Sequence, residues 1–116
     1  MAVNMQVNLG GLVMANPVTD ASGTFAAGRE YSDFVNVAGM GAVTTKGVSL
    51  NGWEGNDSPR IAETPSGMLN SIGLQNPGVK HLCEVDLPWL KSQGVPASGT
   101  VSGHRLEEYV SVVEAL

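Results

Sequence analysis

Residues 42–47, Ala-Val-Thr-Thr-Lys-Gly, form a short β-rich stretch that lies between two segments of helical periodicity. Before it, residues 30–38 carry apolar side chains at helical spacing and are followed by Gly39, a residue suited to a helix C-terminus. After it, the apolar positions of residues 79–91 predict a second helix, which Pro88 interrupts or kinks. A strand between two helices is typical of α/β folds with parallel strands.

The same alternation extends in both directions along the chain. Residues 3–9 alternate apolar and polar side chains, and after Gly10-Gly11 residues 12–14 can return as a second arm, which predicts a β-hairpin. Residues 18–21 read as a short buried strand, a third strand ends near Val101, and residues 106–116 have the periodicity of a helix. The sequence therefore predicts an α/β fold consisting of a hairpin and about three βα units.

Two architectures fit this order of elements: an open parallel sheet covered by helices, and one segment of a larger barrel. Residues 112–116, Val-Val-Glu-Ala-Leu, stop inside an apolar helical pattern without the usual helix-ending residues. A frayed terminal helix on a small domain would explain this ending. We favour the other interpretation, in which residues 1–116 are a single incomplete domain.

The amino-acid composition excludes several classes of partner and site. The net charge of −5 offers no basic footprint for nucleic acid or an anionic membrane, so neither is an expected partner. Cys83 is the only cysteine, which excludes an intramolecular disulfide, and with two histidines it cannot form a structural zinc site. We therefore predict no metal site. The start lacks a signal-peptide pattern and no apolar run is long enough to span a membrane, so a cytoplasmic location is expected.

In parallel α/β folds, ligands bind at the carboxyl ends of the strands. Three predicted strand ends carry small or polar residues, at Ala21-Ser22-Gly23, at Lys46-Gly47 and at Thr100 with Ser102-Gly103. Lys46 suits a carboxylate, a phosphate or an electron-rich ring. A solvated lysine and ordinary Ser-Gly turns are the alternative explanation.

Residues 67–78 combine three amide side chains with glycines. Asn and Gln offer a donor and an acceptor side by side, which suits the edge of a uracil-like ring, although a loop of Asx turns has the same composition. Trp53, in a polar loop, is a candidate lid or contact residue. Cys83 lies on the apolar face of a predicted helix, so we interpret it as a small buried hydrophobe rather than a nucleophile.

Several motifs resemble the dihydroorotate dehydrogenases. They include Asn16-Pro17, Ala21-Ser22-Gly23-Thr24-Phe25 and Thr45-Lys46-Gly47. The most specific is residues 60–78, Arg-Ile-Ala-Glu-Thr-Pro-Ser-Gly-Met-Leu-Asn-Ser-Ile-Gly-Leu-Gln-Asn-Pro-Gly. With Leu87-Pro88-Trp89-Leu90, this stretch is similar to the NAD-linked B-type of the class 1 enzymes, and the similarity extends over essentially the whole chain.

The resemblance implies the N-terminal part of a TIM (β/α)8 barrel that binds FMN and oxidises dihydroorotate to orotate in pyrimidine biosynthesis. It implies that FMN is contacted by Ala21, Ser22, Lys46 and Gly47. It also implies that the substrate is held by Lys46 and Asn70 and by the backbone of Ser71, Ile72, Gly73 and Leu74. Thr100 stands where the family usually has a flavin-facing Asn, and it keeps a hydroxyl but lacks the amide.

The resemblance further implies a homo-oligomer that pairs with a second subunit, whose FAD and iron–sulfur cluster pass electrons to NAD. The family's catalytic Cys follows the fourth strand, beyond Leu116, so the isolated 116 residues are expected to be inactive. Two alternatives remain open. One is a non-catalytic α/β association module, and the other is a related flavin barrel acting on another pyrimidine. The stretch from Asn70 to Gly78 favours dihydroorotate, whereas Thr100 favours the related barrel.

Overall fold

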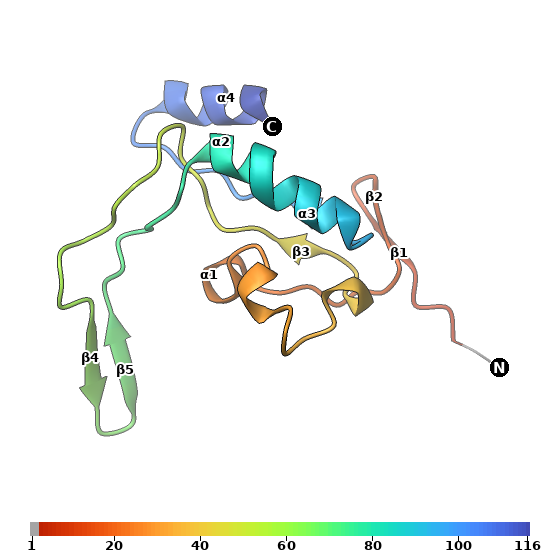
Figure 1. The fold of residues 1–116 in the computed structure, drawn as a ribbon, viewed down its shortest axis with the longest axis horizontal. Helices are drawn as coiled ribbons and strands as arrows, with labels where there is room; N and C mark the ends of the chain where they lie inside the picture. The colour runs from red at the N-terminus through yellow and green to blue at the C-terminus, as the bar shows by residue number, and fades with distance from the viewer. Residues whose placement is uncertain (1–2) are drawn as a thin grey trace.

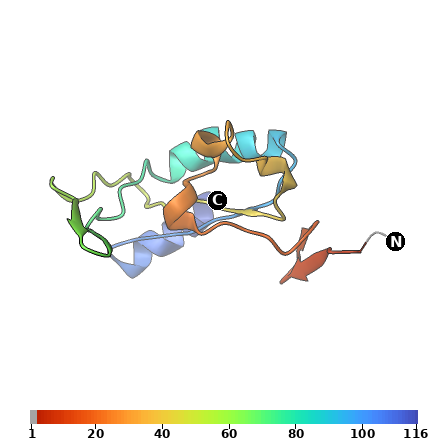
Figure 2. The same cartoon turned by 90° about the horizontal axis from the view of Figure 1, so that it is seen from below.

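The computed structural model describes residues 3–116, and its first elements form a β-hairpin (Figure 1). β1 (Val7–Leu9) pairs antiparallel with β2 (Leu12–Met14), which confirms the predicted hairpin. Gly10 and Gly11 have φ angles of 59° and 101°, the left-handed backbone that a two-residue hairpin turn requires. Figure 2 shows the hairpin at one end of the molecule, apart from the helices.

Three parallel strand segments form the centre of the fold. β3 (Val43–Thr44) pairs with β6 (Ala97–Ser98), and a parallel bridge between Val48 and Val101 continues this pairing. On the other side of β3, Thr19 forms a parallel bridge with the residue that precedes the strand. The segments therefore lie side by side in chain order, as successive βα units require. Among the described residues, the sheets are not closed into a barrel.

The segment between the first two parallel strands differs from expectation. It contains a short helix, α1 (Ser22–Phe25), and two 3₁₀ turns, η1 (Arg29–Tyr31) and η2 (Val37–Gly39). The continuous helix predicted over residues 30–38 is wrong. Its apolar residues do not share one buried face, because the Phe34 side chain is 85% exposed. Without that packing, helical spacing alone does not stabilise a helix of this length.

A second hairpin extends away from the rest of the molecule (Figure 1). β4 (Ile61–Thr64) pairs antiparallel with β5 (Gly67–Asn70), and every residue of both strands is exposed. The sequence predicted only short extended pieces here, because a solvated hairpin lacks the alternation that a buried face imposes. At its base, the Ser71 N–H donates to the Arg60 carbonyl at 2.8 Å, so the two ends of the hairpin lie together.

The predicted helix over residues 79–91 is one continuous helical segment of three parts. α2 (Val79–His81) leads into a π-helical turn, η3 (Leu82–Asp86), and then into α3 (Leu87–Ser92). Pro88 lies in the first turn of α3, and the first N–H of α3 donates to the carbonyl five residues earlier. The expected interruption at Pro88 is thus a π turn rather than a break, because proline cannot supply an N–H to an unbroken α-helix.

α4 (Leu106–Ala115) confirms the last predicted helix and lies beside α2 (Figure 1). Val112 of α4 is fully buried, and its cluster joins the helices to the sheet. The members of this cluster are Val48, Val79, Leu82 and Val112. A second cluster under α3 contains Phe25, Val37, Val43, Leu90 and Val95. Both clusters use residues of β3 or its extension, so the strand is packed by helices along its length.

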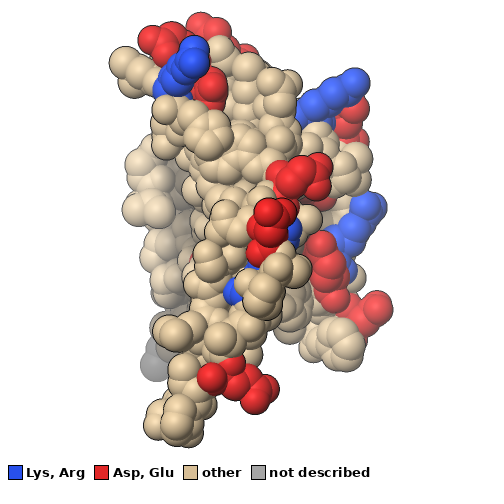
Figure 3. Space-filling view, turned by 90° about the vertical axis from the view of Figure 1, so that its left-hand side faces the viewer, with Lys and Arg blue, Asp and Glu red and all other residues tan. Residues whose placement is uncertain are grey.

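The chain leaves a large area exposed. Its accessible surface is 7789 Å² and its radius of gyration 16.0 Å, whereas a compact protein of 12.0 kDa has about 6,000 Å² and about 13 Å. Large apolar side chains contribute to this excess, and those of Phe34, Leu69 and Leu106 are among the most exposed. Figure 3 shows that one face is mostly uncharged, with acidic and basic groups in small mixed clusters. None of the helices in residues 3–116 is both long enough and apolar enough to cross a membrane.

Candidate functional site

Residues at three neighbouring strand ends form the candidate site. Ser22 follows the first parallel segment, Lys46 and Gly47 follow β3, and Thr100 follows β6. Because parallel strands end at the same edge of a sheet, these residues gather on one side of the molecule. The Lys46 N–H donates to the Ala26 carbonyl at 2.9 Å, which fixes the end of β3 against the turn after α1.

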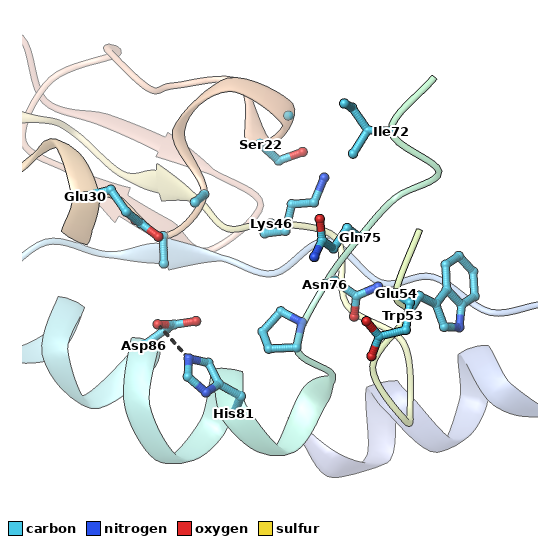
Figure 4. A pocket seen from close by; sticks show the side chains of 14 residues that line it. Ser22, Glu30, Lys46, Trp53, Glu54, Ile72, Gln75, Asn76, His81 and Asp86 are labelled. Carbon is cyan, nitrogen blue, oxygen red and sulfur yellow. Dashed lines mark ion pairs between the residues drawn. The ribbon is translucent and has the colours of Figure 1, made fainter. Parts of the chain in front are cut away.

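A pocket of about 550 Å³ opens at this edge (Figure 4), a volume within the range of small-molecule sites. Its walls come from the α1 region, the end of β3, the loop before α2, and α2 with the π turn that follows. The lining residues are Ser22, Gly23, Ala26, Ala27, Glu30, Lys46, Trp53, Glu54, Ile72, Gln75, Asn76, Pro77, His81 and Asp86.

Lys46 is the one lysine or arginine among these lining residues. In Figure 4 its amino group points toward the space between Ser22 and Ile72, whereas Asp86 lies on the far side of the pocket. Glu30 also lies at that side. The pocket therefore has a cationic end at Lys46 and an acidic end at Asp86 and Glu30, while the third acidic lining residue, Glu54, lies beside Trp53. An anionic or electron-rich ligand would bind at the Lys46 end because of the complementary charge.

Gly47 is buried and has little free space around it. A methyl group on its Cα would lie 3.3 Å from Ser102 Oγ, 3.4 Å from Thr100 Cγ2 and 3.6 Å from Leu74 Cδ1. These contacts bring Gly47, Thr100 and Leu74 together, although they lie far apart in the sequence. A side chain at position 47 would press against these three neighbours, so the close packing here favours glycine.

The segment that follows β5 is held by Asn56. Its Nδ2 donates to Ser71 Oγ at 2.8 Å and to the Ser71 carbonyl at 3.1 Å, and its backbone N–H donates to the Ile72 carbonyl at 3.0 Å. Gly73 and Leu74 then have φ angles of 78° and 52°. A methyl group at Gly73 would lie 2.6 Å from the Asn56 nitrogen, so this turn requires glycine.

Arg60 connects the loop before β4 with the same segment. Its Nη2 donates to the Glu54 carbonyl at 2.9 Å, its Nε donates to the Asn56 carbonyl, and its Nη1 donates to Gln75 Oε1 at 2.7 Å. The guanidinium fork offers several donors in one plane, which is why one arginine can satisfy all three acceptors.

His81 and Asp86 lie at the acidic end of the pocket, and sequence reasoning did not identify either as a site residue. His81 Nε2 lies 3.6 Å from Asp86 Oδ1 (Figure 4). Burial raises the pKa of the Asp86 carboxyl above 3.8, with a further rise from Glu30, while His81 and Arg29 oppose it. The spacing of five residues does not predict contact on an α-helix. The π turn brings them together, so the sequence held no signal for this pair.

Eight of the ten predicted site residues fall into three groups. Ser22, Lys46 and Ile72 line the main pocket. Gly47, Thr100 and Leu74 lie close to one another, outside the lining of that pocket. Asn70 and Ser71 instead line a smaller cavity of about 190 Å³ at the base of the β4–β5 hairpin. Ala21 and Gly73 are exposed, the first immediately before α1 and the second in the left-handed turn. The roles assigned to these residues from the resemblance stay predictions.

The structure also places Cys83 and Trp53, the two other residues that the sequence singled out. Cys83 Sγ lies 3.4 Å from the Ala115 carbonyl of α4 and packs against the apolar cluster, away from the pocket. Trp53 lines the pocket and stacks on His104, with ring centroids 4.2 Å apart. Residues 3–116 contain no group of three His, Cys, Asp or Glu side chains placed to hold a metal ion.

The comparisons with known proteins match this chain over nearly its whole length. The family described as dihydroorotate dehydrogenase matches residues 4–116. The chain belongs to the dihydroorotate dehydrogenase family. Its sequence is 50% identical to the "Dihydroorotate dehydrogenase B (NAD(+)), catalytic subunit" of Alkaliphilus metalliredigens, 54% identical to that of Lachnoclostridium phytofermentans and 45% identical to that of Thermoanaerobacter pseudethanolicus. Each match covers 98% of this chain and 38% of the relative.

These matches confirm the resemblance to the B-type catalytic subunit of dihydroorotate dehydrogenase and its limit to an N-terminal portion. The relation is to an oxidoreductase family of pyrimidine biosynthesis. Because the chain spans about two fifths of the length of these relatives, their activity and partners are not transferred to it directly.

Proposed function

We propose that this chain takes part in the FMN-dependent oxidation of (S)-dihydroorotate to orotate. The observation that carries the proposal is the pocket in which Lys46, the one lysine or arginine among the described lining residues, lies between Ser22 and the Ile72 segment. A cation at a parallel strand end suits both a reduced, electron-rich flavin ring and the carboxylate of the substrate. Membership of the dihydroorotate dehydrogenase family selects this chemistry from the others that such a pocket would accept.

The residues present fit FMN. Ser22, Gly23 and Ala26 line the same pocket as Lys46, and these small residues leave room for a flat ring to approach the backbone. We propose that Ala21, Ser22, Lys46 and Gly47 hold the cofactor, with Thr100 beside Gly47 offering a hydroxyl. When bound, FMN supplies the two-electron acceptor of the reaction. The positive charge of Lys46 favours binding of the anionic reduced form.

The substrate is proposed to bind between Lys46 and the segment from Asn70 to Leu74. Within residues 3–116, the backbone N–H groups of Gly73 and Leu74 make no hydrogen bond. Free donors of this kind match the ring carbonyls and carboxylate of a pyrimidine acid. Asn70, at the end of β5, lines the separate cavity at the base of the hairpin, and we propose that its side-chain amide binds the substrate from there. Lys46 attracts the substrate carboxylate and orients it by charge.

We further propose that the three parallel segments are the first strands of a (β/α)8 barrel and that residues 1–116 are one incomplete domain. Their order in space, which follows the order in the chain, supports this proposal. The excess exposed apolar surface indicates that further protein covers it. Because the relatives are named as catalytic subunits, we propose a homo-oligomer together with an electron-transfer subunit whose FAD and iron–sulfur cluster pass electrons to NAD. The cytoplasm is the proposed location.

Isolation of the protein in its native length tests the proposed activity. We expect it to retain FMN and to reduce an electron-accepting dye when dihydroorotate is added. Dihydrouracil, which lacks the carboxylate, should not replace it, because Lys46 would have no anionic group to attract. Oxidation of dihydrouracil alone would instead support a related flavin enzyme for another pyrimidine. Absence of FMN and of orotate binding would support an association module.

We also propose that residues 1–116, prepared alone, do not oxidise dihydroorotate. The proposed reaction uses a cysteine base, and the thiol of Cys83 faces the Ala115 carbonyl rather than the pocket. Dye reduction by the 116-residue chain with added FMN and dihydroorotate, above that of FMN without protein, would contradict this expectation.

A further inference from the structure

Asn76 has a buried side chain, and both its Oδ1 and its Nδ2 form hydrogen bonds. The residue is only 6% exposed. Its Oδ1 accepts hydrogen bonds from Ser49 N at 3.1 Å, Ser49 Oγ at 3.1 Å and Gly78 N at 3.0 Å. Its Nδ2 donates to the Leu74 carbonyl at 2.9 Å. One amide group therefore connects the extension of β3, the start of α2 and the loop between them.

The backbone of Asn76 is anchored as firmly as its side chain. Its N–H donates to the Trp53 carbonyl at 3.0 Å and its carbonyl accepts from Trp53 N–H at 2.9 Å, forming an antiparallel bridge. The Ser49 carbonyl in turn accepts from Val79 N–H at 2.8 Å. These hydrogen bonds hold the backbone of Asn76 in place, and this fixes the position of its side-chain Nδ2.

The hydrogen bond from Nδ2 reaches the left-handed turn at Leu74, whereas the three hydrogen bonds accepted by Oδ1 come from Ser49 and Gly78. Leu74 has a φ of 52°, a left-handed conformation that costs a residue with a side chain roughly 1–2 kcal/mol. A hydrogen bond to its carbonyl opposes this cost. The Leu74 side chain also lies next to Gly47, so the turn is held beside the strand end that carries Lys46.

We propose that Asn76 is a positioning residue for the pyrimidine ligand. Its Nδ2 holds Leu74 in the left-handed conformation, so that the free N–H groups of Gly73 and Leu74 keep a fixed arrangement for orotate and dihydroorotate. This inference rests on the proposed function, because it names the ligand of that same site. Asn76 is one of the residues that line the pocket, and in this proposal its effect is transmitted through the Leu74 carbonyl.

The variant Asn76→Asp separates positioning from stability. The introduced carboxylate keeps the acceptor for Ser49 and Gly78 but replaces the Nδ2 donor with a second acceptor, which repels the Leu74 carbonyl. Ser49→Ala is the matched control, since it removes the contacts of Ser49 Oγ with Asn76 Oδ1 and the Asn51 carbonyl and leaves the Nδ2 bond intact. Both variants are prepared in the FMN-loaded protein of native length, and the Kd for orotate is measured from the change in the flavin absorption spectrum.

We expect Asn76→Asp to raise the Kd for orotate roughly tenfold, equivalent to about 1.4 kcal/mol. Lowering the pH should reverse much of this loss relative to the unsubstituted protein, because the protonated carboxyl again donates to the Leu74 carbonyl. Ser49→Ala should lower the melting temperature and leave the Kd within about twofold, since the lost contacts leave the Nδ2 hydrogen bond in place. An unchanged Kd in Asn76→Asp, or an equal rise without pH-dependent recovery in both variants, would overturn the inference.

A measurement on the unsubstituted protein keeps the test independent of how the variants fold. The side-chain amide protons of Asn76 should exchange slowly with solvent, and their NMR signals should shift when orotate is added. Signals that do not respond to bound orotate contradict the positioning role. Failure of the unsubstituted protein to bind orotate at all contradicts the proposed function instead, and with it the ligand named here.

Discussion

Arg60 Nη1 lies 2.7 Å from Gln75 Oε1, and this contact joins the base of the exposed β4–β5 hairpin to the wall of the pocket. The same guanidinium bonds the carbonyls of Glu54 and Asn56. The loop before β4 and the segment before α2 are therefore held together by one side chain. The β4–β5 hairpin itself buries little surface against the rest of the molecule, because all residues of its strands are exposed.

Replacing Arg60 by lysine should loosen both segments. A lysine has one nitrogen and cannot reach all three acceptors at once, so we expect the free energy of unfolding to fall by about 1–2 kcal/mol. Urea unfolding measures this change. Arg105→Lys, at an exposed position before α4, retains the charge and should stay within about 0.5 kcal/mol of the original protein. Equal effects of the two substitutions would rule out a stabilising role for the three Arg60 hydrogen bonds.

Asp86 should make stability depend on pH in a defined direction. Its pKa is raised above 3.8, chiefly by burial, so the folded state binds more protons than the unfolded state just above that pH. Its contribution to stability is therefore greatest below 3.8 and declines as the pH rises through the folded-state pKa. Asp86→Asn removes the carboxyl and should remove this decline.

The measurement is the free energy of unfolding of both proteins from acidic to neutral pH. The stability of Asp86→Asn relative to the unsubstituted protein should increase across that window and then become constant. Glu84→Gln, on an exposed residue of the same π turn, is the control and should not reproduce the change. A relative stability that decreases with pH would show that the ion pair with His81, rather than burial, dominates.

Gly41 should tolerate no side chain. A methyl group on its Cα would overlap the Asn16 carbonyl oxygen and lie 3.1 Å from the Val18 oxygen, both of them backbone atoms that cannot rotate away. We expect Gly41→Ala to cost about 3 kcal/mol or to prevent folding. Gly23→Ala is the control, because nothing lies within 4 Å of the added methyl group in α1. Thermal unfolding followed by circular dichroism compares the two, and similar melting temperatures would refute the expected overlap.

Lys46→Met tests the cationic end of the pocket. Methionine keeps much of the apolar stem and removes the charge, so we expect orotate binding to weaken by more than about tenfold, as loss of a charged hydrogen-bond donor predicts. FMN content and orotate affinity are measured on the same preparation. Lys80→Met, on the exposed side of α2, removes the same charge outside the pocket and should leave both quantities unchanged. Equal losses in both variants would indicate an effect of net charge alone.

Local patterns in the sequence predicted the elements whose formation depends on neighbouring residues. Gly10-Gly11 predicted the hairpin turn because few other residues accept its backbone angles. The spacing of apolar residues predicted the helical segment after residue 79 and the helix from Leu106, since each buries one face. The expected helix over residues 30–38 failed because most of its apolar side chains are exposed, and only Val37 among them is buried in the core.

The strand ends that carry Ser22, Lys46 and Thr100 were also identified from the sequence, because chemistry-bearing residues after parallel strands meet at one edge. The tertiary structure shows, in addition, contacts that the sequence did not predict. The π turn joins His81 to Asp86, and the buried amide of Asn76 connects Ser49 to Leu74. These contacts depend on backbone geometry and on desolvated partners from other segments, and neither quantity is encoded in the spacing of residues along the chain.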